Sequence, residues 1–348
     1  MATPAEHAAM RRALELAVRP DAPLGPNPRV GAVLLGPDGT TLAEGHHRGA
    51  GTPHAEVQAL AAARARGHDP AGATMVVTLE PCSHHGRTPP CTGALREAGV
   101  ARVVFALADP TPVAAGGAAV LAGAGVEVEG GLLAEQARAT NLAWLRMVAA
   151  ARPWVTWKFA ATLDGRVAAP DGTSRWITSA QARADAHARR ARADAVLVGT
   201  GTVRADDPTL TARDAEGLPL PRQPLRAVMG RSPVPPDAKV LDGAARTVLL
   251  DTRDPHEALA RLAAHGVADV LLEGGPTLAA AFVRAGLVDE VLAYLAPALL
   301  GAGPAAVGDI GVATMAAAAR LSTEQVTQVG PDLRVLARFL PEPTEGAK

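Results

Sequence analysis

The sequence predicts an α/β protein made of two domains. The chain has 348 residues, which is long for one domain and enough for two that each bury a core. Segments rich in Val, Leu and Thr alternate with helical patterns through both halves, which is typical of layered α/β folds. A new strand begins after Pro153, so we place the two domains at residues 1–147 and 153–348.

The first domain is expected to alternate strands with helices. A helix over residues 5–19 opens it. Strands are predicted at 29–35, 41–47, 74–80, 102–108 and 126–130. Further helices are predicted at 54–66, 92–98, 114–123 and 132–151.

The second domain repeats this alternation. Strands are predicted at 154–161, 195–199, 226–229, 246–251, 268–273, 289–295 and 332–339. Helices are predicted at 180–192, 256–265 and 276–286. The weakly polar stretch 291–308 approaches the length of a membrane span, but prolines and glycines interrupt it, so we interpret it as a strand and a loop.

The composition argues against several classes of protein. A net charge of -1 and an aromatic content of 3% do not suit a nucleic-acid binder. The N-terminus carries charge and no apolar segment, so we expect no signal peptide, no membrane attachment and a cytoplasmic location. Cys82 and Cys91 lie in one short segment and do not make a disulfide framework. The expected partner is a small molecule.

Three side chains in the first half form a metal-binding pattern. His54 lies in Pro-His-Ala-Glu, and Cys82 and Cys91 lie in Glu-Pro-Cys-Ser-His-His-Gly-Arg-Thr-Pro-Pro-Cys. One imidazole and two thiolates can hold a Zn²⁺ ion and leave its fourth position open to water, which is the catalytic arrangement. His54 and Cys91 each open a predicted helix, where the helix dipole favours a thiolate. We therefore predict one zinc ion per chain.

Glu56 is the predicted catalytic residue, two positions after His54 in the same first turn. Zinc lowers the pKa of a bound water to about 7, and Glu56 can carry its proton to the ring and the departing ammonia. The pattern is the signature of zinc nucleobase deaminases, although eight residues separate the cysteines here where the usual motif has two. Two alternatives stay open: a pair of buried or disulfide-bonded cysteines, and a structural zinc with His84 or His85 as fourth ligand.

The second half contains two glycine turns that follow predicted strands. One is Glu273-Gly274-Gly275-Pro276 and the other is Gly199-Thr200-Gly201. Free N–H groups and the dipole at a helix start of this kind suit a diphosphate. No Gly-x-Gly-x-x-Gly motif follows a strand here, so the pattern by itself leaves cofactor binding open.

The zinc motif, together with residues 25–31 and Gly45-His46-His47, resembles the bifunctional deaminase–reductase of bacterial riboflavin biosynthesis. The second half resembles the same family at 158–166, 174–178, 199–213 and 273–275. The resemblance implies a cytidine-deaminase-like three-layer domain followed by a dihydrofolate-reductase-like domain. It also implies deamination of a diaminopyrimidinone ribotide to an aminouracil ribotide, then NADPH-dependent reduction of the ribosyl group to a ribityl group.

The resemblance also carries site residues over by position. The deaminase substrate would be bound by Asn27, His47, Arg87 and Asp109. NADPH would be bound by Ala160, Trp176, Thr202, Asp206, Gly275, Pro276, Thr277, Leu278, Ala279, Ala280 and Ala281. The reductase substrate would be bound by Ser174, Arg190, Leu210, Arg213 and Glu273. The two arginines suit bidentate phosphate binding.

Two departures from the family pattern are visible. Thr111 replaces an Asn and removes an amide donor, and Gly230-Arg231 replaces Asp-Ser. We take contact of Arg231 with the 2′-phosphate of NADPH as a hypothesis. Other interpretations stay open for single residues, since Arg190 could belong to a solvated helix face and Trp176 to the core.

Two other functions remain possible at this stage. One is a single-activity deaminase whose second half has another use. The other is a non-catalytic, zinc-stabilised sensor of a flavin precursor, although a sensor has no use for Glu56 beside the zinc. We expect a homodimer, while the sequence does not fix the oligomeric state.

Overall fold

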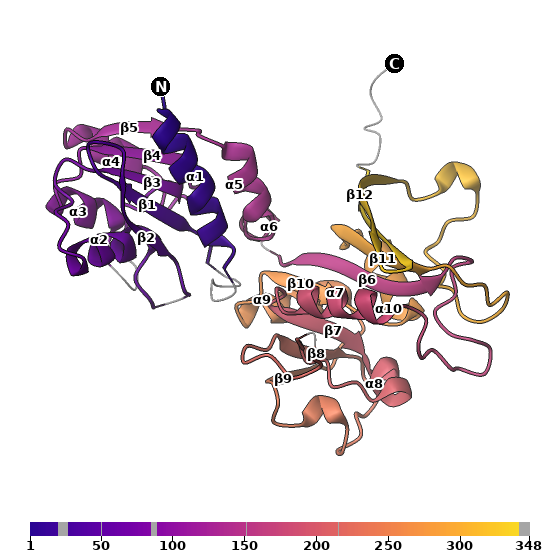
Figure 1. The fold of residues 1–348 in the computed structure, drawn as a ribbon. Coiled ribbons are helices and arrows are strands. Elements are labelled where there is room, and N and C mark those ends of the chain that lie inside the picture. The colour runs from indigo at the N-terminus through magenta and orange to yellow at the C-terminus, as the bar shows by residue number, and fades with distance from the viewer. Residues whose placement is uncertain (20–26, 50, 85–88, 151, 215, 341–348) are drawn as a thin grey trace. The chain divides into compact units, whose positions relative to one another are not determined.

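The structure is a computed structural model that describes residues 1–19, 27–49, 51–84, 89–150, 152–214 and 216–340. The chain divides into two compact units, Met1–Ala151 and Arg152–Lys348 (Figure 1). None of the helices in the described ranges has the length and apolar character of a membrane span.

The first unit contains a five-stranded sheet in the order β2-β1-β3-β4-β5. Its strands are β1 (Gly31–Leu35), β2 (Thr41–His46), β3 (Thr74–Leu79), β4 (Arg102–Leu107) and β5 (Glu127–Gly130). Strand β1 runs antiparallel to β2 and β3, whereas β3, β4 and β5 run parallel. The carboxyl ends of β3 and β4 therefore meet at one edge, where the zinc motif and Asp109 follow.

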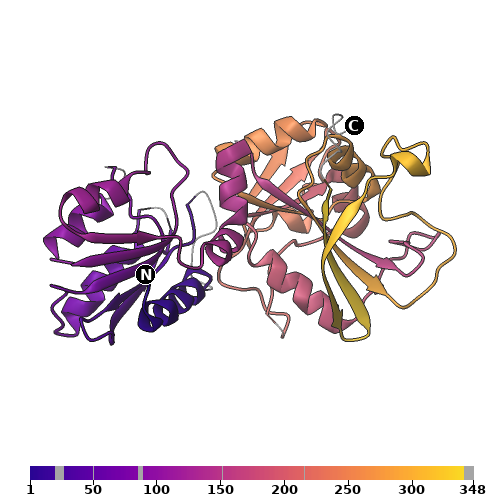
Figure 2. The same cartoon turned by 90° about the horizontal axis from the view of Figure 1, so that it is seen from above.

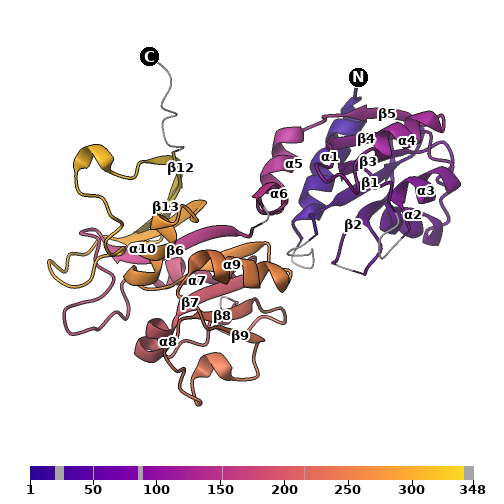
Figure 3. The same cartoon turned by 180° about the vertical axis from the view of Figure 1, so that it is seen from behind.

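Helices cover both faces of this sheet. They are α1 (Pro4–Ala17), α2 (Ala55–Ala65), α3 (Cys91–Glu97), α4 (Gly117–Gly123), α5 (Ala134–Thr140) and α6 (Leu142–Ala150). Helices α1 and α5 pack together on one face, while α2, α3 and α4 are neighbours on the other (Figures 1 and 3). Every residue of β1 is buried because it has helices on both sides. This is the three-layer arrangement expected of a cytidine-deaminase-like domain.

The second unit contains an eight-stranded sheet in the order β12-β13-β11-β6-β10-β7-β8-β9. Its strands are β6 (Trp154–Thr162), β7 (Ala195–Gly199), β8 (Leu225–Met229), β9 (Thr247–Leu250), β10 (Asp269–Leu272), β11 (Glu290–Ala296), β12 (Leu321–Val329) and β13 (Asp332–Phe339). The strands from β11 to β9 run parallel, and β13 and β12 complete the sheet as an antiparallel hairpin. Ligands of such sheets bind at the carboxyl ends of the parallel strands.

Two hydrophobic cores lie on opposite faces of this second sheet. The helices are α7 (Ala180–Arg190), α8 (Thr200–Asp206), α9 (Pro255–Ala264) and α10 (Pro276–Arg284), with short 3₁₀ turns η1 (Lys239–Leu241) and η2 (Met315–Ala317). Leu259 of α9 and Phe282 of α10 share one core with Leu197. Val203 of α8 shares the other with Val196. Since alternate residues of β7 enter different cores, β7 is a central, two-sided strand.

Most predicted elements are present with ends shifted by a few residues, and three predictions were wrong. The helix predicted at 132–151 is two helices, α5 and α6, with Asn141 between them. The glycine turn expected at Gly199-Thr200-Gly201 is the start of α8 (Thr200–Asp206), which the sequence analysis did not predict as a helix. Strand β12 is absent from the prediction, because residues 321–326 are all exposed and show no alternation of apolar and polar positions.

Candidate active sites

Three candidate zinc ligands come together in the first unit. His54 is the cap residue before α2, Cys91 is the first residue of α3, and Cys82 follows β3. The Nδ1 atom of His54 lies 3.2 Å from Sγ of Cys91 and 3.6 Å from Sγ of Cys82. Donors bound to one tetrahedral zinc lie about 3.4 to 3.8 Å apart, given bonds of about 2.0 to 2.3 Å. The donor set therefore fits a zinc ion.

Both thiols suit a metal site rather than a disulfide or an inert core position. Cys82 and Cys91 are free and buried. The hydrogen bond from the Cys91 thiol, with a further one from His54, lowers the pKa of Cys82. No fourth His, Cys, Asp or Glu among the described residues joins the three ligands, and His85 lies outside those residues. This ligand count is that of a catalytic zinc site and not of a closed structural one.

A glycine on β2 lets the zinc helix approach the sheet. A Cβ atom at Gly45 would lie 2.2 Å from the carbonyl oxygen of Ala55, the first residue of α2. Only glycine permits this approach, since any other side chain would push the start of α2 away. This close packing sets the position of the first turn of α2, and therefore the positions of His54 and Glu56, the residues before and after Ala55.

Glu56 is buried beside the zinc ligands. Only 4% of its surface is exposed, and its carboxyl group interacts with the thiol of Cys91. Burial raises the pKa of Glu56 above its ordinary value. A carboxyl group in this position can accept and release a proton close to the metal.

A cavity of about 460 Å³ opens onto this cluster. Four of its lining residues are Asn27, His47, Glu56 and Asp109, which come from separate parts of the first unit. His47 is 5% exposed, its ring stands edge-on to that of His54 at 5.3 Å, and its Nδ1 atom has no hydrogen-bond partner among the described residues. Arg87, also expected here, lies outside the described residues.

Hydrogen bonds to two acidic side chains, Asp109 and Glu80, organise one wall of this cavity. Asp109 Oδ1 accepts hydrogen bonds from the N–H and the hydroxyl of Thr111, at 2.8 and 2.6 Å. Glu80 accepts from the N–H groups of Asp109 and Ala118, at 3.2 and 2.9 Å. Thr111 therefore orients Asp109, and both line the cavity. This role of Glu80 could not be predicted from its place in the zinc motif, because its partners lie 29 and 38 residues along the chain.

Residues at the end of the first unit complete the cavity. Trp144 of α6 lines it and is 7% exposed. Asn141 donates to the carbonyl of Arg29 at 3.0 Å and accepts from its N–H at 2.8 Å. This pair of bonds holds the segment that carries Asn27. Neither Asn141 nor Trp144 belongs to a motif that sequence reasoning could single out.

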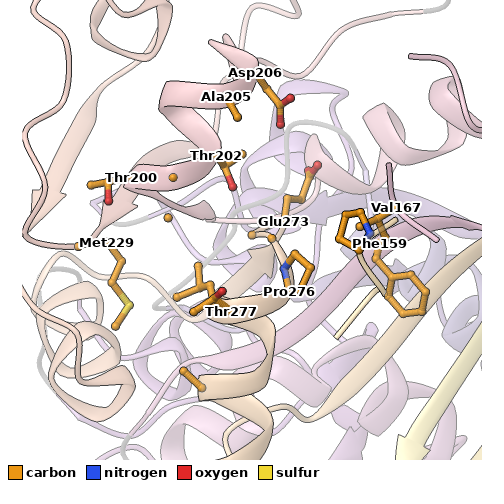
Figure 4. A pocket seen from close by; sticks show the side chains of 18 of the residues that line it. Phe159, Val167, Thr200, Thr202, Ala205, Asp206, Met229, Glu273, Pro276 and Thr277 are labelled. Carbon is orange, nitrogen blue, oxygen red and sulfur yellow. The ribbon is translucent and has the colours of Figure 1, made fainter. Parts of the chain in front are cut away.

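The second unit has a cavity of about 840 Å³ at the carboxyl ends of its parallel strands. Ten of the expected contact residues line it: Ala160, Ser174, Thr202, Asp206, Glu273, Gly275, Pro276, Thr277, Leu278 and Ala281. Figure 4 shows Met229 and Thr200 at one side and Phe159 and Val167 at the opposite side, with Glu273 and Pro276 between them. The start of α10 thus lies at the middle of the cavity.

The start of α10 presents free backbone donors to this cavity. Gly275 caps the helix without a side-chain hydrogen bond, and Pro276 is its first residue. The N–H groups of the first helical turn have no partner within the helix, and the dipole adds positive potential. These groups suit a diphosphate, which is the part of NADPH that a helix start binds.

A buried ion cluster lies beside the same cavity. Arg190 donates to Glu273 through Nε at 3.0 Å and Nη2 at 2.9 Å, and the Lys158 ammonium lies 3.5 Å from the same carboxylate. Burial by itself raises the pKa of Glu273, but the charges of Arg190 and Lys158 outweigh burial and lower the pKa to about 2. Glu273 is therefore an anion at any physiological pH. His187 of α7 is close to this cluster, and burial together with the charge of Arg190 lowers its pKa to about 4.

The expected reductase substrate residues are linked through this cluster. Arg190 also donates to the carbonyl of Thr211 at 2.8 Å, and Arg213 donates to the Thr211 hydroxyl at 3.2 Å. Leu210, next to Thr211, is 4% exposed and has a positive φ of 53°. The structure thus brings Arg190, Leu210, Arg213 and Glu273 into one region.

Some expected cofactor residues do not line the cavity. Trp176 is 69% exposed, and its ring lies 4.2 Å from the Arg183 guanidinium. Ala279 and Ala280 are buried on the core side of α10. Arg231 is exposed and outside the lining, whereas Ser232 belongs to it.

Comparison with known proteins decides the family. Residues 4–107 match the cytidine and deoxycytidylate deaminase zinc-binding region, and residues 153–335 match the RibD C-terminal domain. The riboflavin biosynthesis protein RibD of Mycobacterium tuberculosis is 53% identical over 309 residues, which cover 88% of this chain and 90% of that protein. This chain belongs to the RibD family. RibD of Escherichia coli is 40% identical over 358 residues, covering 93% of this chain and 96% of the relative.

Solved RibD structures share the whole fold. The Thermotoga maritima diaminohydroxyphosphoribosylaminopyrimidine deaminase/5-amino-6-(5-phosphoribosylamino)uracil reductase has a TM-score of 0.88 at 33% identity, covering 97% of this chain and 99% of that chain. RibD of Acinetobacter baumannii has a TM-score of 0.87 at 37% identity, with the same coverage. The RibD chain described here is a bifunctional deaminase and reductase of riboflavin biosynthesis. Its cofactors are zinc, at His54, Cys82 and Cys91, and NADPH.

Proposed function

We propose that this RibD chain deaminates a diaminopyrimidinone ribotide and then reduces the ribosyl group of the resulting aminouracil ribotide. The T. maritima protein is described by this pair of activities, and it matches nearly the full length of this chain. Residues 1–147 would carry the deaminase and 153–348 the reductase. The observation that carries the proposal is the pair of cavities, one with Glu56 beside the zinc ligands and one with Glu273 beside a helix start.

In the deaminase step, water replaces the amino group of the ring and ammonia leaves. Zinc, when bound, supplies a water activated at neutral pH. Glu56 takes the proton of that water and passes it to the ring nitrogen and the leaving amine. Its buried position keeps bulk water from competing for the proton.

Polar side chains around the cavity would orient the ring. Asn27 offers an amide that can both donate and accept, and Asp109 accepts from a ring amino group. The buried, unpaired Nδ1 of His47 is available to the substrate. Arg87, by its position in the family motif, would bind the phosphate.

In the reductase step, a hydride would add to C1 of the sugar, the bond from C1 to the ring oxygen would break, and that oxygen would take up a proton, so that the ribosyl group becomes a ribityl group. NADPH, when bound, supplies that hydride, and the protein orients it and excludes water. The first turn of α10 would hold the diphosphate, with Thr202 and Asp206 as neighbours. Glu273 would accept hydrogen bonds from the ring or the sugar, and Arg190 and Arg213 would attract the phosphate.

We further propose that the protein is a homodimer formed through the hairpin of β12 and β13. Strand β12 is the edge of the sheet and pairs only with β13 (yellow in Figure 2). The hairpin exposes Leu321, Val326 and Leu333, at 42%, 58% and 41%. A long exposed edge strand with apolar side chains is covered in most stable proteins, and a second copy is the simplest cover.

We place the enzyme in the cytoplasm, where a reducing environment keeps Cys82 and Cys91 as metal-binding thiolates.

The reaction order can be measured in one sample. The purified, zinc-loaded protein is mixed with the diaminopyrimidinone ribotide and NADPH, and ammonia release and NADPH oxidation are followed together. The proposal requires both signals, with NADPH oxidation lagging behind ammonia release. Ammonia release without NADPH oxidation would refute the reductase half, and oxidation without ammonia release would refute the proposed order.

A further inference from the structure

Two arginines that line the reductase cavity, Arg253 and Arg284, make no hydrogen bond or ion pair within the described part of the chain. Among the described residues, the charged side chains that line this cavity are Lys158, Asp206, Arg253, Glu273 and Arg284. Lys158 is paired with Glu273, 3.5 Å away. A cation that faces a nucleotide cavity without a protein partner points to an anionic ligand.

Arg253 lies at the end of the cavity opposite the site of chemistry. Ser232 follows β8 and Arg253 follows β9, and these strands are parallel neighbours. The N–H of Gly230 donates to the carbonyl of Leu250 at 3.1 Å, which ties the two strand ends together. Met229, the last residue of β8, lies away from Phe159 and Val167 in the cavity (Figure 4). With the diphosphate at the start of α10, in the middle of the cavity, the two halves of NADPH would extend to opposite ends, the nicotinamide half toward Phe159 and Val167 and the adenosine half toward Met229.

The turn that carries Arg253 is held in place by its neighbours. The Thr252 hydroxyl donates to Glu257 and accepts from the N–H of Asp254. Asp254 in turn caps α9 by accepting from the N–H of His256 at 2.9 Å. Thr252 is 1% exposed and lines the cavity. The backbone of Arg253 is therefore fixed between two anchored residues, and only its side chain is free to meet a ligand.

A glycine also lets the turn after β8, which carries Ser232, approach this end of the cavity. Gly230 has a φ of 138°, and a Cβ atom there would lie 2.6 Å from the Thr200 hydroxyl at the start of α8. Gly230 is thus packed against the start of α8, and Ser232, two residues on, lines the cavity. Arg231, between these two residues, is exposed and does not line the cavity.

We propose that Arg253, together with Ser232, binds the 2′-phosphate of NADPH and makes the reductase select NADPH over NADH. The proposal rests on the proposed reductase function. In dinucleotide sites of parallel sheets, an acid at such a strand end binds the 2′-hydroxyl of NAD, whereas an arginine accommodates the 2′-phosphate. Arg284 is a less suitable partner, because it lies about 12 Å along α10 from Pro276, farther than one ribose separates the diphosphate from the 2′-phosphate.

Direct binding to the zinc-loaded full chain tests the proposal without turnover. Titration calorimetry with 2′,5′-ADP and with ADP measures the contribution of the 2′-phosphate. The wild type is expected to bind 2′,5′-ADP more tightly. Arg253→Ala is expected to weaken 2′,5′-ADP by at least about tenfold, as for loss of a charge-assisted hydrogen bond, and to leave ADP unchanged. Arg253→Lys should recover part of the loss, since it keeps the charge but not the planar fork.

Matched variants separate this proposal from its competitors. Arg246→Ala removes an exposed arginine at the opposite end of β9 and should leave the ratio of the two affinities unchanged. Equal weakening of both ligands by Arg253→Ala would mean that Arg253 stacks on adenine, and would overturn the proposal. Loss of discrimination in Arg231→Ala or Arg284→Ala, with Arg253→Ala unaffected, would overturn it as well.

The failure of this inference differs from the failure of the proposed function. If the wild type oxidises NADH as fast as NADPH while forming the ribityl product, the reductase function stands and the selectivity proposal is wrong. If neither dinucleotide is oxidised and neither ADP ligand binds, the reductase function itself is wrong and the proposal falls with it.

Discussion

The guanidinium of Arg190 and the carboxylate of Glu273 form a two-pronged ion pair, with Nε 3.0 Å and Nη2 2.9 Å from the two carboxylate oxygens. Their side chains are only 15% and 11% exposed. The pair joins the end of α7 to the end of β10, where the reductase cavity begins. The ion pair therefore stabilises the second unit and also holds the carboxylate of Glu273 in position at the cavity.

Replacing Glu273 with Gln should damage both properties. The substitution leaves Arg190 and Lys158 without their counter-charge, which typically costs about 3 to 5 kcal/mol in the free energy of unfolding. NADPH oxidation should fall by at least about tenfold, while ammonia release is retained. Urea unfolding and the two activity assays measure these effects. Glu135→Gln, which removes an exposed carboxylate 3.8 Å from Arg138, is the control and should change stability by less than about 1 kcal/mol.

The pH dependence of the free energy of unfolding should reflect the ionisation of Glu273. Its pKa is about 2 in the folded protein, against an ordinary value of 4.5. A carboxyl group with a depressed folded pKa stabilises the fold above its unfolded pKa and loses that contribution as the pH falls toward its folded pKa. The stability difference between wild type and Glu273→Gln should thus be constant above about pH 5.5 and shrink between about pH 4.5 and 2. A difference that stays constant down to about pH 3 would contradict this assignment.

Replacing Glu56 with Gln should abolish deamination and leave zinc bound. The amide keeps the shape of the side chain but cannot carry the proton, so ammonia release should fall by about 10² to 10⁴-fold. Elemental analysis should still find one zinc per chain, because the ligands are His54, Cys82 and Cys91. Reduction of added aminouracil ribotide should be unchanged. Loss of zinc in this variant, or retained ammonia release, would refute the role given to Glu56.

Arg226 should be a strong determinant of stability in the second unit. It is fully buried and donates hydrogen bonds to Thr247, to Asp242 and to the carbonyl of Thr209. Arg226→Met should lower the free energy of unfolding by at least about 3 kcal/mol, since it leaves several buried acceptors and Asp242 without a donor. Arg246→Met, at an exposed position on the neighbouring chain segment, should stay within about 0.5 kcal/mol of the wild type.

The proposed dimer can be tested at the exposed hairpin. Val326→Lys places a charge in the middle of β12, where 58% of the native side chain is exposed. Light scattering after gel filtration should find a dimer for the wild type and a monomer for the variant, with unchanged circular dichroism. Leu241→Lys, at an exposed apolar position on η1, should remain a dimer. A wild-type monomer would refute the dimer, and a dimeric Val326→Lys variant would move its interface away from β12.

The three zinc ligands could be predicted because the chemistry of the metal dictates residue types at short spacing. His54 and Glu56 share one helical turn, and each cysteine adjoins a strand or helix end, so the local sequence carries the geometry. The layered fold could also be predicted, because strand patterns and helical patterns alternate along the sequence. The exposed strand β12 could not be read in this way, because no buried face imposes an alternating pattern on it.

The surroundings of both cavities could not be predicted, because they depend on strand order. Arg190 and Glu273 are 83 residues apart, and nothing in the sequence says that they bind each other. Ser232 and Arg253 line the same cavity because β8 and β9 are neighbours in the sheet. The sequence favoured Arg231, which is adjacent to Ser232 but lies outside the cavity lining.

The position of Asn141 and Trp144 bears on how the two activities can be separated by genetic engineering. A deaminase fragment that stops at the last strand of its sheet would lack the clamp on Arg29 and an aromatic wall of the cavity. The gene therefore has to be split after α6, within the few codons before Pro153, if the upstream product is to keep a complete deaminase cavity. The helical stretch between the last strand of the first sheet and Pro153 is therefore, for the deaminase, part of the enzyme.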